Sequence, residues 1–359
     1  MSDSLAVIVG NKKYEGWESI AVSTSMDSIC SAFDVSLLNS VNVKDIYPGI
    51  PIELLVDDEV VCTGFIDKRN RKIDDSSGKT LSFSGRDKTC DLVDCSVVKK
   101  SGSWTKISLL DLCKEVCKPF DISVSVDPAV DLGKIFKSVT VQDGESVFAL
   151  IERLSRQRSV LPLSDAKGNL LLTVAQSRAC DDVLSSEGNI KVIEEGIDYS
   201  NRFSDYTVKG QDSGGGNPWN KAAVTGIRGT ATDNVIKNVL KRYRPLIIQA
   251  ESNTDAKYAQ QRASWEAVVR FGRSLSLKID VQGWRQSSGI LWQRNYLVDV
   301  FHKDLDIDAT FLIDGCSYKV DDSGGHVTSL SLSHKDALMP EPDGNVAKKD
   351  KSAKNPWLS

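Results

Sequence analysis

The sequence contains no apolar run that approaches the length of a membrane-spanning helix. Its first residues, Met-Ser-Asp-Ser-Leu, lack the basic start and the long apolar stretch of a signal peptide. We therefore expect a protein that is made and assembled in the cytoplasm and has no membrane partner. At 359 residues the chain is long for a single core, so we expect several domains.

The signatures of common enzymes are absent as well. The sequence holds no Gly-x-Ser-x-Gly elbow, phosphate loop, Gly-x-Gly-x-x-Gly or His-Glu-x-x-His. Residues 212–215 and 322–325 both read Asp-Ser-Gly-Gly, as around a trypsin-like nucleophile, but neither has a preceding Gly. We interpret both strings as turns. A carboxylate pair from distant strands stays open for glycoside chemistry, although no pair stands out. The three histidines all lie near the C-terminus: His302, His326 and His334.

Metal-binding and disulfide patterns are lacking too. No two of the eight cysteines form a Cys-x-x-Cys pair, and most lie among apolar residues. This predicts reduced thiols in hydrophobic cores rather than disulfides or metal ligands. The cysteines are Cys30, Cys62, Cys90, Cys95, Cys113, Cys117, Cys180 and Cys316. We predict no catalytic, cofactor-binding or metal-binding residues.

Positive charge is not in excess. The formal net charge of −4 argues against a protein whose main work is to grip nucleic acid. Basic and aromatic residues do mix at 241–244 and 265–273. We interpret these arginines and lysines as solvated or paired, with a nucleic-acid groove and a protein–protein interface as the alternatives.

One stretch of sequence occurs twice. Residues 72–78 read Lys-Ile-Asp-Asp-Ser-Ser-Gly, and residues 319–325, 247 positions later, read Lys-Val-Asp-Asp-Ser-Gly-Gly. The Ile-Asp that leads into each copy keeps this offset, whereas the alternating strands that follow, 81–84 and 330–333, lie 249 apart. Small and acidic turn residues between alternating strands are typical of a β-hairpin. The sequence therefore predicts two copies of one β-domain, with a two-residue insertion in one copy.

The predicted fold is mixed and mainly β, with two similar small antiparallel β-domains, each a barrel or sandwich, plus smaller α+β domains. An inserted segment makes the second copy longer than the first. The predicted divisions are residues 1–97 (first β-domain), 98–185 (α+β domain), 186–210 with 280–336 (second β-domain), 211–279 (inserted α+β segment) and 337–359 (extended tail).

Helix signals lie outside the two β-domains. Ser108 begins a capping box before a helix whose apolar face is Leu109, Leu112, Cys113, Val116 and Cys117, and Pro119 ends it. A second helix begins near residue 143 and buries Val147, Leu150, Ile151 and Leu154. The inserted segment should hold a strand at 222–227, a short helix at 235–240, and a long helix at 254–271 with Thr254 as its N-cap.

The tail is rich in proline and lysine and is not expected to pack as a core. It ends in Pro356, Trp357 and Leu358, which are candidates for docking on a partner or on the body of the protein.

Several strings give the chain a family resemblance. Residues 64–67 (Gly-Phe-Ile-Asp), 85–95 (Gly-Arg-Asp-Lys-Thr-Cys-Asp-Leu-Val-Asp-Cys), 203–210 and 242–248 carry it, together with the Pro-Trp ending. With these strings the sequence resembles the baseplate hub proteins of Mu-like contractile-tailed bacteriophages over essentially its whole length.

The resemblance implies a structural protein of the virion, located in the tail baseplate and assembled in the host cytoplasm. It implies a homotrimer in which each subunit carries two β-barrel domains related by a rotation of about 60°. The implied partners are the tail tube protein, a trimeric central spike protein and other baseplate proteins, with DNA passing through a channel without specific binding. No catalytic activity and no cofactor are expected. The alternatives are a tail-tip cell-wall hydrolase and a secretion-system spike component.

Overall fold

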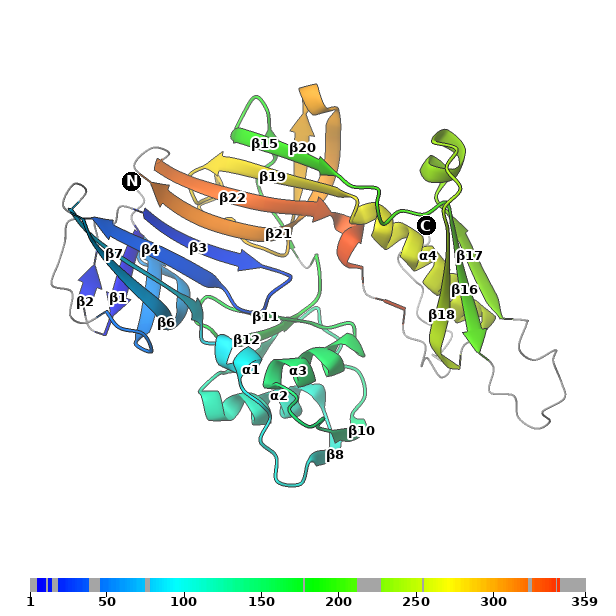
Figure 1. Ribbon diagram of the computed structural model, residues 1–359, viewed down its shortest axis with the longest axis horizontal. Coiled ribbons are helices and arrows are strands. Elements are labelled where there is room, and N and C mark those ends of the chain that lie inside the picture. Colours follow the sequence, from blue (N-terminus) through cyan, green and yellow to red (C-terminus); the bar gives the residue numbers. More distant parts are fainter. Residues whose placement is uncertain are drawn as a thin grey trace. The chain divides into compact units, whose positions relative to one another are not determined.

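The computed structural model describes residues 5–10, 12–14, 19–38, 46–74, 78–176, 178–211, 227–253, 255–321, 325–339 and 341–342. The chain divides into two compact units (Figure 1). The larger unit comprises Met1–Ile197 and Leu275–Lys335, and the smaller comprises Asp198–Ser274 and Asp336–Ser359. None of the helices in the described ranges is both long and apolar enough to cross a membrane.

The first repeat is a sheet of seven strands in the N-terminal part of the chain. Its order is β3-β4-β7-β6-β5-β1-β2, and every neighbouring pair is antiparallel. Apolar side chains at every second position, such as Phe33, Val35 and Leu37 of β4, are buried in the core. The strands are β1 (Leu5–Val9), β2 (Lys12–Tyr14), β3 (Ser19–Ser25), β4 (Ala32–Leu38), β5 (Pro51–Val56), β6 (Glu59–Asp74) and β7 (Gly78–Asp87).

The second repeat combines C-terminal strands with strands from the middle of the chain. Its order is β15-β19-β22-β21-β20, all antiparallel, and two short strands pair in parallel with β20. Strand β19 buries Leu277, Ile279 and Val281, as β4 does with its own three residues. The elements are β13 (Arg178–Ala179), β14 (Leu184–Ser185), β15 (Ile190–Ile197), β19 (Leu275–Gln282), β20 (Tyr296–His302), η3 (Lys303–Leu305), β21 (Ile307–Asp321) and β22 (Gly325–His334).

The two repeats share one strand order, which confirms the duplicated hairpin. Strands β3, β4, β7, β6 and β5 correspond to β15, β19, β22, β21 and β20. Gly85 pairs with Ile66, and Leu332 pairs with Ile313, so both strands of the hairpin keep the offset of 247. The predicted two-residue insertion is therefore wrong. An alternating pattern looks the same after a slip of two residues, so the sequence could not distinguish these registers.

Each long strand of the hairpin carries a β-bulge at the same position. The register of β6 against β7 skips Asp67, and the register of β21 against β22 skips Asp314. A bulge bends its strand and increases the local twist, so the strand can have different neighbours on its two sides. Before the bulge, β6 pairs with β5 and β21 pairs with β20; after it, residues 315–320 of β21 pair with β3.

The repeats are fused into one open sheet of 14 strands (Figure 1). Strand β21 pairs antiparallel with β3, while β2 and β15 stand at the two ends of the strand path. Across the described ranges no strand pairing closes either repeat, so the expectation of two separate barrels is corrected. The physical reason is that β3, whose outer edge could close the first repeat on itself, instead extends the sheet into the second repeat.

A small α+β region follows the first repeat and contains two short sheets, β10-β8 and β11-β12-β9. The predicted capping residue Ser108 begins α2, and its hydroxyl accepts from the Asp111 amide at 3.1 Å. Ser146 caps α3 in the same way, and all nine residues predicted for the two apolar helix faces are buried. The elements are α1 (Cys90–Asp94), β8 (Ser103–Ile107), α2 (Leu109–Cys117), η1 (Lys118–Phe120), β9 (Val124–Val126), β10 (Phe136–Thr140), α3 (Val147–Arg156), β11 (Leu161–Ser164) and β12 (Leu170–Thr173).

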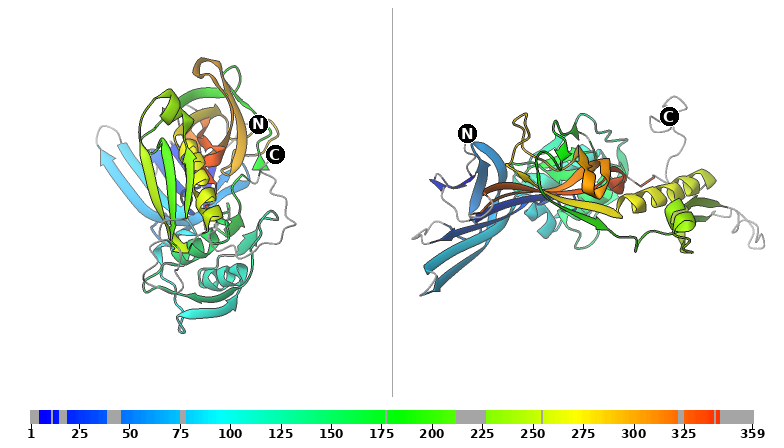
Figure 2. Two further views of the ribbon diagram at one scale, coloured as in Figure 1. Left: turned by 90° about the vertical axis from the view of Figure 1, so that its right-hand side faces the viewer. Right: turned by 90° about the horizontal axis from the view of Figure 1, so that it is seen from above.

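The smaller unit is a three-stranded sheet, β17-β16-β18, covered by one long helix, α4 (Figure 2). The sequence predicts β16 as part of the second β-domain, but it pairs with β17 and β18 and buries Tyr206 and Val208 within this unit. Helix α4 is capped by Asp255, whose carboxylate accepts from the Tyr258 amide at 2.7 Å. The expected cap Thr254, and nearly all of the strand expected at 222–227, lie outside the described residues. The elements are β16 (Asp205–Gln211), β17 (Arg228–Thr232), η2 (Val235–Val239), β18 (Pro245–Asn253), α4 (Ala256–Gly272) and η4 (Lys335–Leu338).

Candidate functional site: the junction between the repeats

The pairing of β21 with β3 joins the two repeats. Its register places Tyr318 opposite Val22, and both side chains are buried in the core that the repeats share. On the other face, the hydroxyls of Ser23 and Ser317 lie 2.8 Å apart. Of the six residue pairs in this register, one contains a charge, Lys319. The junction is therefore an essentially neutral strand pairing with a buried face.

Two strand edges correspond to this junction but have no strand partner in the described part of the chain. One is the outer edge of β15, the counterpart of β3, and the other is residues 68–73 of β6, the counterpart of residues 315–320. Residues 68–72 read Lys-Arg-Asn-Arg-Lys, whereas β15 carries the exposed Glu194 and Glu195. Neither edge is predicted as a site from the sequence. The signal that could have found them is the run of four cations among five strand residues.

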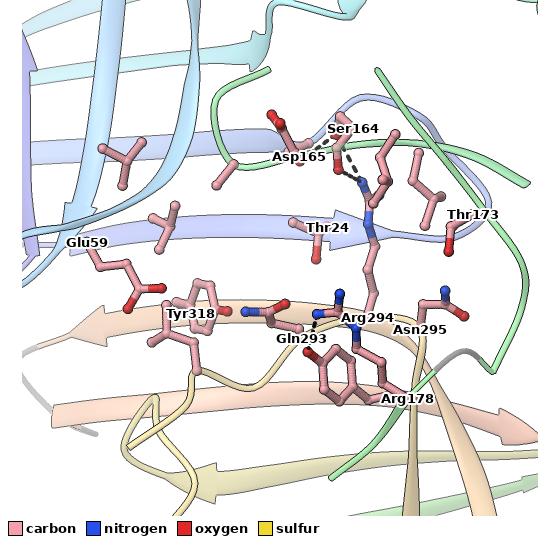
Figure 3. A pocket seen from close by; sticks show the side chains of 18 of the residues that line it. Thr24, Glu59, Ser164, Asp165, Thr173, Arg178, Gln293, Arg294, Asn295 and Tyr318 are labelled. Atoms are coloured by element: carbon pink, nitrogen blue, oxygen red, sulfur yellow. Dashed lines mark hydrogen bonds between the residues drawn. The ribbon is translucent and has the colours of Figure 1, made fainter. Parts of the chain in front are cut away.

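A cavity of about 220 Å³, lined by both polar and apolar side chains, adjoins the junction, and the buried Arg294 from the loop before β20 reaches along it (Figure 3). Its guanidinium donates to the carbonyl oxygen of Ser25, to that of Ser28 at 3.1 Å, and to the carbonyl and hydroxyl oxygens of Ser164 at 2.9 and 3.0 Å. Burial lowers the pKa of Arg294. One side chain of the second repeat thus links the loop after β3 to the end of β11, which makes it a structural cross-link.

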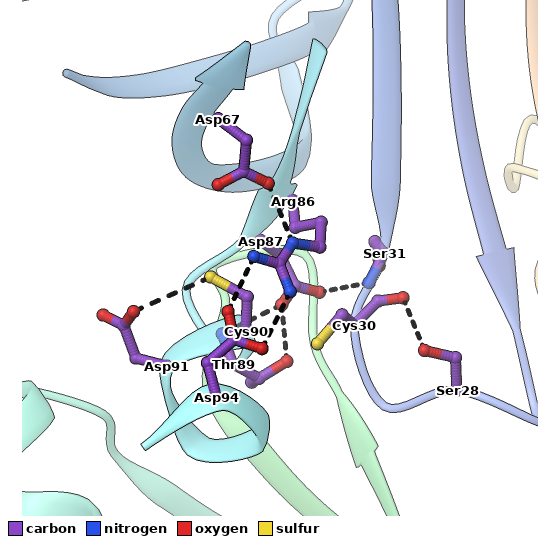
Figure 4. Close-up of polar contacts among 10 residues, drawn as sticks. All are labelled: Ser28, Cys30, Ser31, Asp67, Arg86, Asp87, Thr89, Cys90, Asp91 and Asp94. Atoms are coloured by element: carbon purple, nitrogen blue, oxygen red, sulfur yellow. Dashed lines mark hydrogen bonds and ion pairs between the residues drawn. The ribbon is translucent and has the colours of Figure 1, made fainter. Parts of the chain in front are cut away.

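A second cluster of polar contacts lies where β7 enters α1 (Figure 4). The carboxylate of the buried Asp87 accepts from the Ser31 amide at 2.7 Å, from the Thr89 amide at 2.9 Å and from the Thr89 hydroxyl at 2.5 Å. These bonds satisfy the carboxylate and fix the loop before β4 against the end of β7.

Arg86 connects the bulge of β6 to α1 in the same cluster. Its Nε donates to Asp67 at 2.8 Å, and its two terminal nitrogens donate to Asp94 at 3.2 and 2.8 Å. The hydrogen bonds from Arg86 hold the pKa of Asp94 below its ordinary value. Residues 85–95, one of the strings that carries the family resemblance, therefore have a structural role: they form the connection between the end of β7 and α1.

The eight cysteines are free thiols. Five of them are buried, and Cys95 is exposed. Burial raises the pKa of Cys30 to about 11 and that of Cys90 to about 12. Because the thiolate is the reactive form, these two side chains remain inert thiols at neutral pH.

Two of the three histidines pack against aromatic rings. His326 lies against Trp284 with 4.4 Å between ring centroids, and His334 lies edge-on to Phe311 at 6.4 Å. Within the described ranges, no group of three or more His, Cys, Asp and Glu side chains could hold a metal ion. The string at 212–215 and most of the string at 322–325 lie outside those ranges, as do the predicted docking residues Pro356, Trp357 and Leu358.

The basic and aromatic side chains of α4 are paired inside the smaller unit, which is the interpretation that the sequence favoured. Trp265 Nε1 donates to the carbonyl of Met339 at 2.9 Å, and Arg273 Nε donates to that of Ala337 at 3.1 Å. Both oxygens of Glu266 accept from arginines, namely Arg262 and Arg270. These contacts hold the segment after β22, so the three arginines serve packing within this unit.

Three families match successive parts of the sequence. Residues 4–87 match the N-terminal domain of Mu phage baseplate assembly protein GpP-like proteins. Residues 89–174 match the second domain of baseplate hub protein gp44-like proteins, and residues 255–341 match the fourth domain of Mu phage baseplate assembly protein GpP.

Individual proteins match over nearly the whole chain. The chain is 31% identical over 346 residues to the baseplate hub protein gp44 of Escherichia phage Mu, covering 94% of this chain and 90% of that protein. It is 32% identical to the 43 kDa tail protein of prophage MuSo2 from Shewanella oneidensis, with a TM-score of 0.80 over 94% of this chain and 98% of that one. The tail protein from Neisseria meningitidis MC58, 22% identical, shares the fold with a TM-score of 0.77 over 96% and 99% of the two chains.

The duplicated sheet and these structural matches define a phage tail protein. More particularly, the chain belongs to the family of the baseplate hub protein gp44 of phage Mu. It is therefore a structural component of the tail baseplate of a Mu-like virion, as the resemblance implied.

Proposed function

We propose that three copies of the chain form a ring with pseudo-sixfold symmetry in the baseplate. The observation that carries this proposal is the duplication within one chain: two repeats share one strand order and one bulge, and they are joined edge to edge. Three such chains around a threefold axis present six equivalent sheets, with the two repeats of a chain related by a rotation of about 60°.

Such a ring matches two different symmetries. Its six repeats fit a hexameric tail tube protein, and its three chains fit a trimeric central spike protein. The ring leaves a channel through which DNA passes during ejection, and the net charge of −4 favours passage without binding. The α+β region after the first repeat and the smaller unit contact neighbouring baseplate proteins, and Pro356, Trp357 and Leu358 dock the C-terminal segment of the chain on a partner or on the protein itself. Assembly takes place in the host cytoplasm.

The mass of the purified protein in solution tests the ring. One chain has a mass of 39.3 kDa, so native mass spectrometry and light scattering should show a species of three chains. A reconstruction of the phage tail should place it between tube and spike. A monomer at the highest soluble concentration, together with its absence from that position in the tail, would overturn the proposal.

A further inference from the structure

The junction inside one chain is a template for a junction between chains. Residues 68–73 of β6 and the outer edge of β15 are the counterparts of the two edges that meet at the junction of β21 with β3. In the strand order, six strands separate β15 from β6, and the sheet between them is open. Within the single chain these two edges are not paired with each other, so a second copy of the chain would have to supply the complementary edge for each.

The two hairpins keep a constant offset of 247 residues, so each residue of β6 has one counterpart on β21. Arg71 of β6 corresponds to Tyr318 of β21, and Lys72 corresponds to Lys319. In the internal junction Tyr318 lies opposite Val22. The partner of Arg71 is accordingly the residue that takes the place of Val22 in the second repeat.

The strand pairs of β15 identify that residue. Val22 pairs with Phe33 of β4, and Glu195 pairs with Leu277 of β19. Phe33 and Leu277 are themselves counterparts, because their partners on β7 and β22 are related by the same offset. Glu195 therefore takes the place of Val22 and lies opposite Arg71.

We infer that the outer edge of β15 in one protomer pairs antiparallel with residues 68–73 of β6 in the next protomer, in the register of the internal junction. This inference rests on the proposed ring and names the strands that close it. The residue pairs are Ile193 with Ile73, Glu194 with Lys72, Glu195 with Arg71, Gly196 with Asn70, and Ile197 with Arg69.

Two consecutive pairs in this register join opposite charges. Lys72 meets Glu194 on one face and Arg71 meets Glu195 on the other, because successive side chains alternate across a strand. All four side chains are exposed in the single chain. Lys72 lies 3.4 Å from Asp74 of its own strand, an exposed contact that is worth little. Directly opposed charges of opposite sign stabilise a strand pair.

The exposed isoleucines of the two edges, and the poor charge match of the alternative pairings, also support the pairing of β15 with β6. Ile73 is 77% exposed and Ile197 is 57% exposed, and the proposed pairing covers Ile73 with Ile193. Two β6 edges would bring the cationic residues 68–72 against each other, and two β15 edges would oppose glutamates, which destabilises both arrangements. Only the head-to-tail pairing matches charge, and a head-to-tail interface is the kind that closes into a ring.

Charge reversal with rescue tests the pairing. The variants Arg71→Glu/Lys72→Glu and Glu194→Lys/Glu195→Arg should each raise the concentration at half-assembly by about a hundredfold or more. The quadruple variant, which restores opposite charges at both pairs, should reassemble. The matched control Lys100→Glu/Lys137→Glu changes the charge of the chain as much as the first variant, at exposed residues away from both edges, and should assemble as the wild type does. Circular dichroism and thermal unfolding establish that each variant is folded.

The outcomes separate this inference from the proposed ring. A wild-type trimer whose double variants also remain trimers would overturn the strand pairing and leave the ring standing. A quadruple variant that folds but stays monomeric would overturn the register. A wild-type protein that is monomeric at every concentration would overturn both.

A disulfide checks the register independently of charge. Asn70→Cys and Gly196→Cys lie directly opposite each other in the proposed pairing, at a Cα separation of about 5 Å, which a disulfide can span. In a Cys95→Ser background, oxidation should link this variant into covalent trimers. The control Asn70→Cys/Val192→Cys, displaced by four residues, should not link. Equal linking in both variants would contradict the register.

Discussion

Asp67 and Asp314 occupy the same bulge in two copies of one hairpin, but their carboxylates lie in different surroundings. Asp67 is exposed and accepts from Arg86 at 2.8 Å. Asp314 is half-buried, and its burial, together with the nearby carboxylate of Asp27, raises its pKa. One duplicated position thus carries an ion-paired carboxylate in one repeat and a desolvated one in the other.

Replacing Asp314 by asparagine should stabilise the protein at pH 7. A raised pKa means that the folded state binds the proton more tightly than the unfolded chain, so the ionised carboxylate costs stability above the folded pKa. That cost disappears as the pH falls through the folded pKa towards 3.8. Thermal unfolding at a series of pH values should show the variant more stable than the wild type at pH 7, with a difference that shrinks on acidification. Asp67→Asn is the matched control and should lose up to about 1 kcal/mol with its exposed ion pair. Equal effects of the two substitutions at pH 7 would contradict the assignment.

Arg294→Met should strongly destabilise the larger unit. The substitution removes the donors to the buried carbonyl oxygen of Ser164 and to the partly buried contacts at Ser25 and Ser28, at a cost of about 2–5 kcal/mol. Denaturant titration measures the free energy of unfolding. The control Arg285→Met removes a partly exposed arginine that pairs with carboxylates and should cost about 1 kcal/mol or less. A loss at Arg294 no larger than this control would show that the cross-link does not hold the junction.

Arg202→Met should destabilise the smaller unit by about 3–5 kcal/mol. Arg202 and Asp233 form a buried, bidentate ion pair with distances of 2.8 and 3.0 Å, and removing one partner leaves the other charge buried. Hydrogen exchange of amides in β16 and α4 would report the loss locally. The exposed pair of Lys237 with Asp205 offers the comparison, because Lys237→Met should leave the exchange rates nearly unchanged. Similar rates in the two variants would contradict the prediction.

Gly229→Ala should separate α4 from the sheet of the smaller unit. A Cβ atom at Gly229 would lie 2.0 Å from the carbonyl oxygen of Ala259, so the helix backbone would have to move. We expect a loss of at least about 2 kcal/mol in unfolding experiments, as for other overpacked sites. Gly188→Ala, whose Cβ would find its first neighbour at 3.6 Å, should be tolerated. Full stability of the Gly229 variant would show that the close approach is dispensable.

Local signals in the sequence predicted much of the fold. The cap at Ser108, the buried helix faces and the repeated hairpin all depend on residues close together in the chain, where periodicity and turn chemistry act directly. The helix cap and the buried faces have a single local interpretation, whereas the alternating strands of the hairpin left a register ambiguity of two residues.

Pairings between distant segments could not be predicted in the same way. Ser23 and Ser317 meet across 294 residues of chain, and nothing in the composition of β3 indicates that its outer edge continues into β21. The sequence therefore predicts closed barrels, and it places β16 in the wrong sheet. The charges at residues 68–72 and at Glu194 are visible in the sequence, but their complementarity appears only once the counterparts of the two repeats are known.

The position of the smaller unit has a consequence for how such proteins diversify. Ile197 at the end of β15 pairs with Leu275 at the start of β19, so the whole segment Asp198–Ser274 leaves and returns at neighbouring points. The corresponding connection of the first repeat, between the end of β3 at Ser25 and the start of β4 at Ala32, is a short loop. The segment Asp198–Ser274 can therefore be exchanged, lengthened or deleted during evolution without altering a strand pair of the two repeats. The surface that this segment presents can then change while the sheet formed by the repeats stays the same.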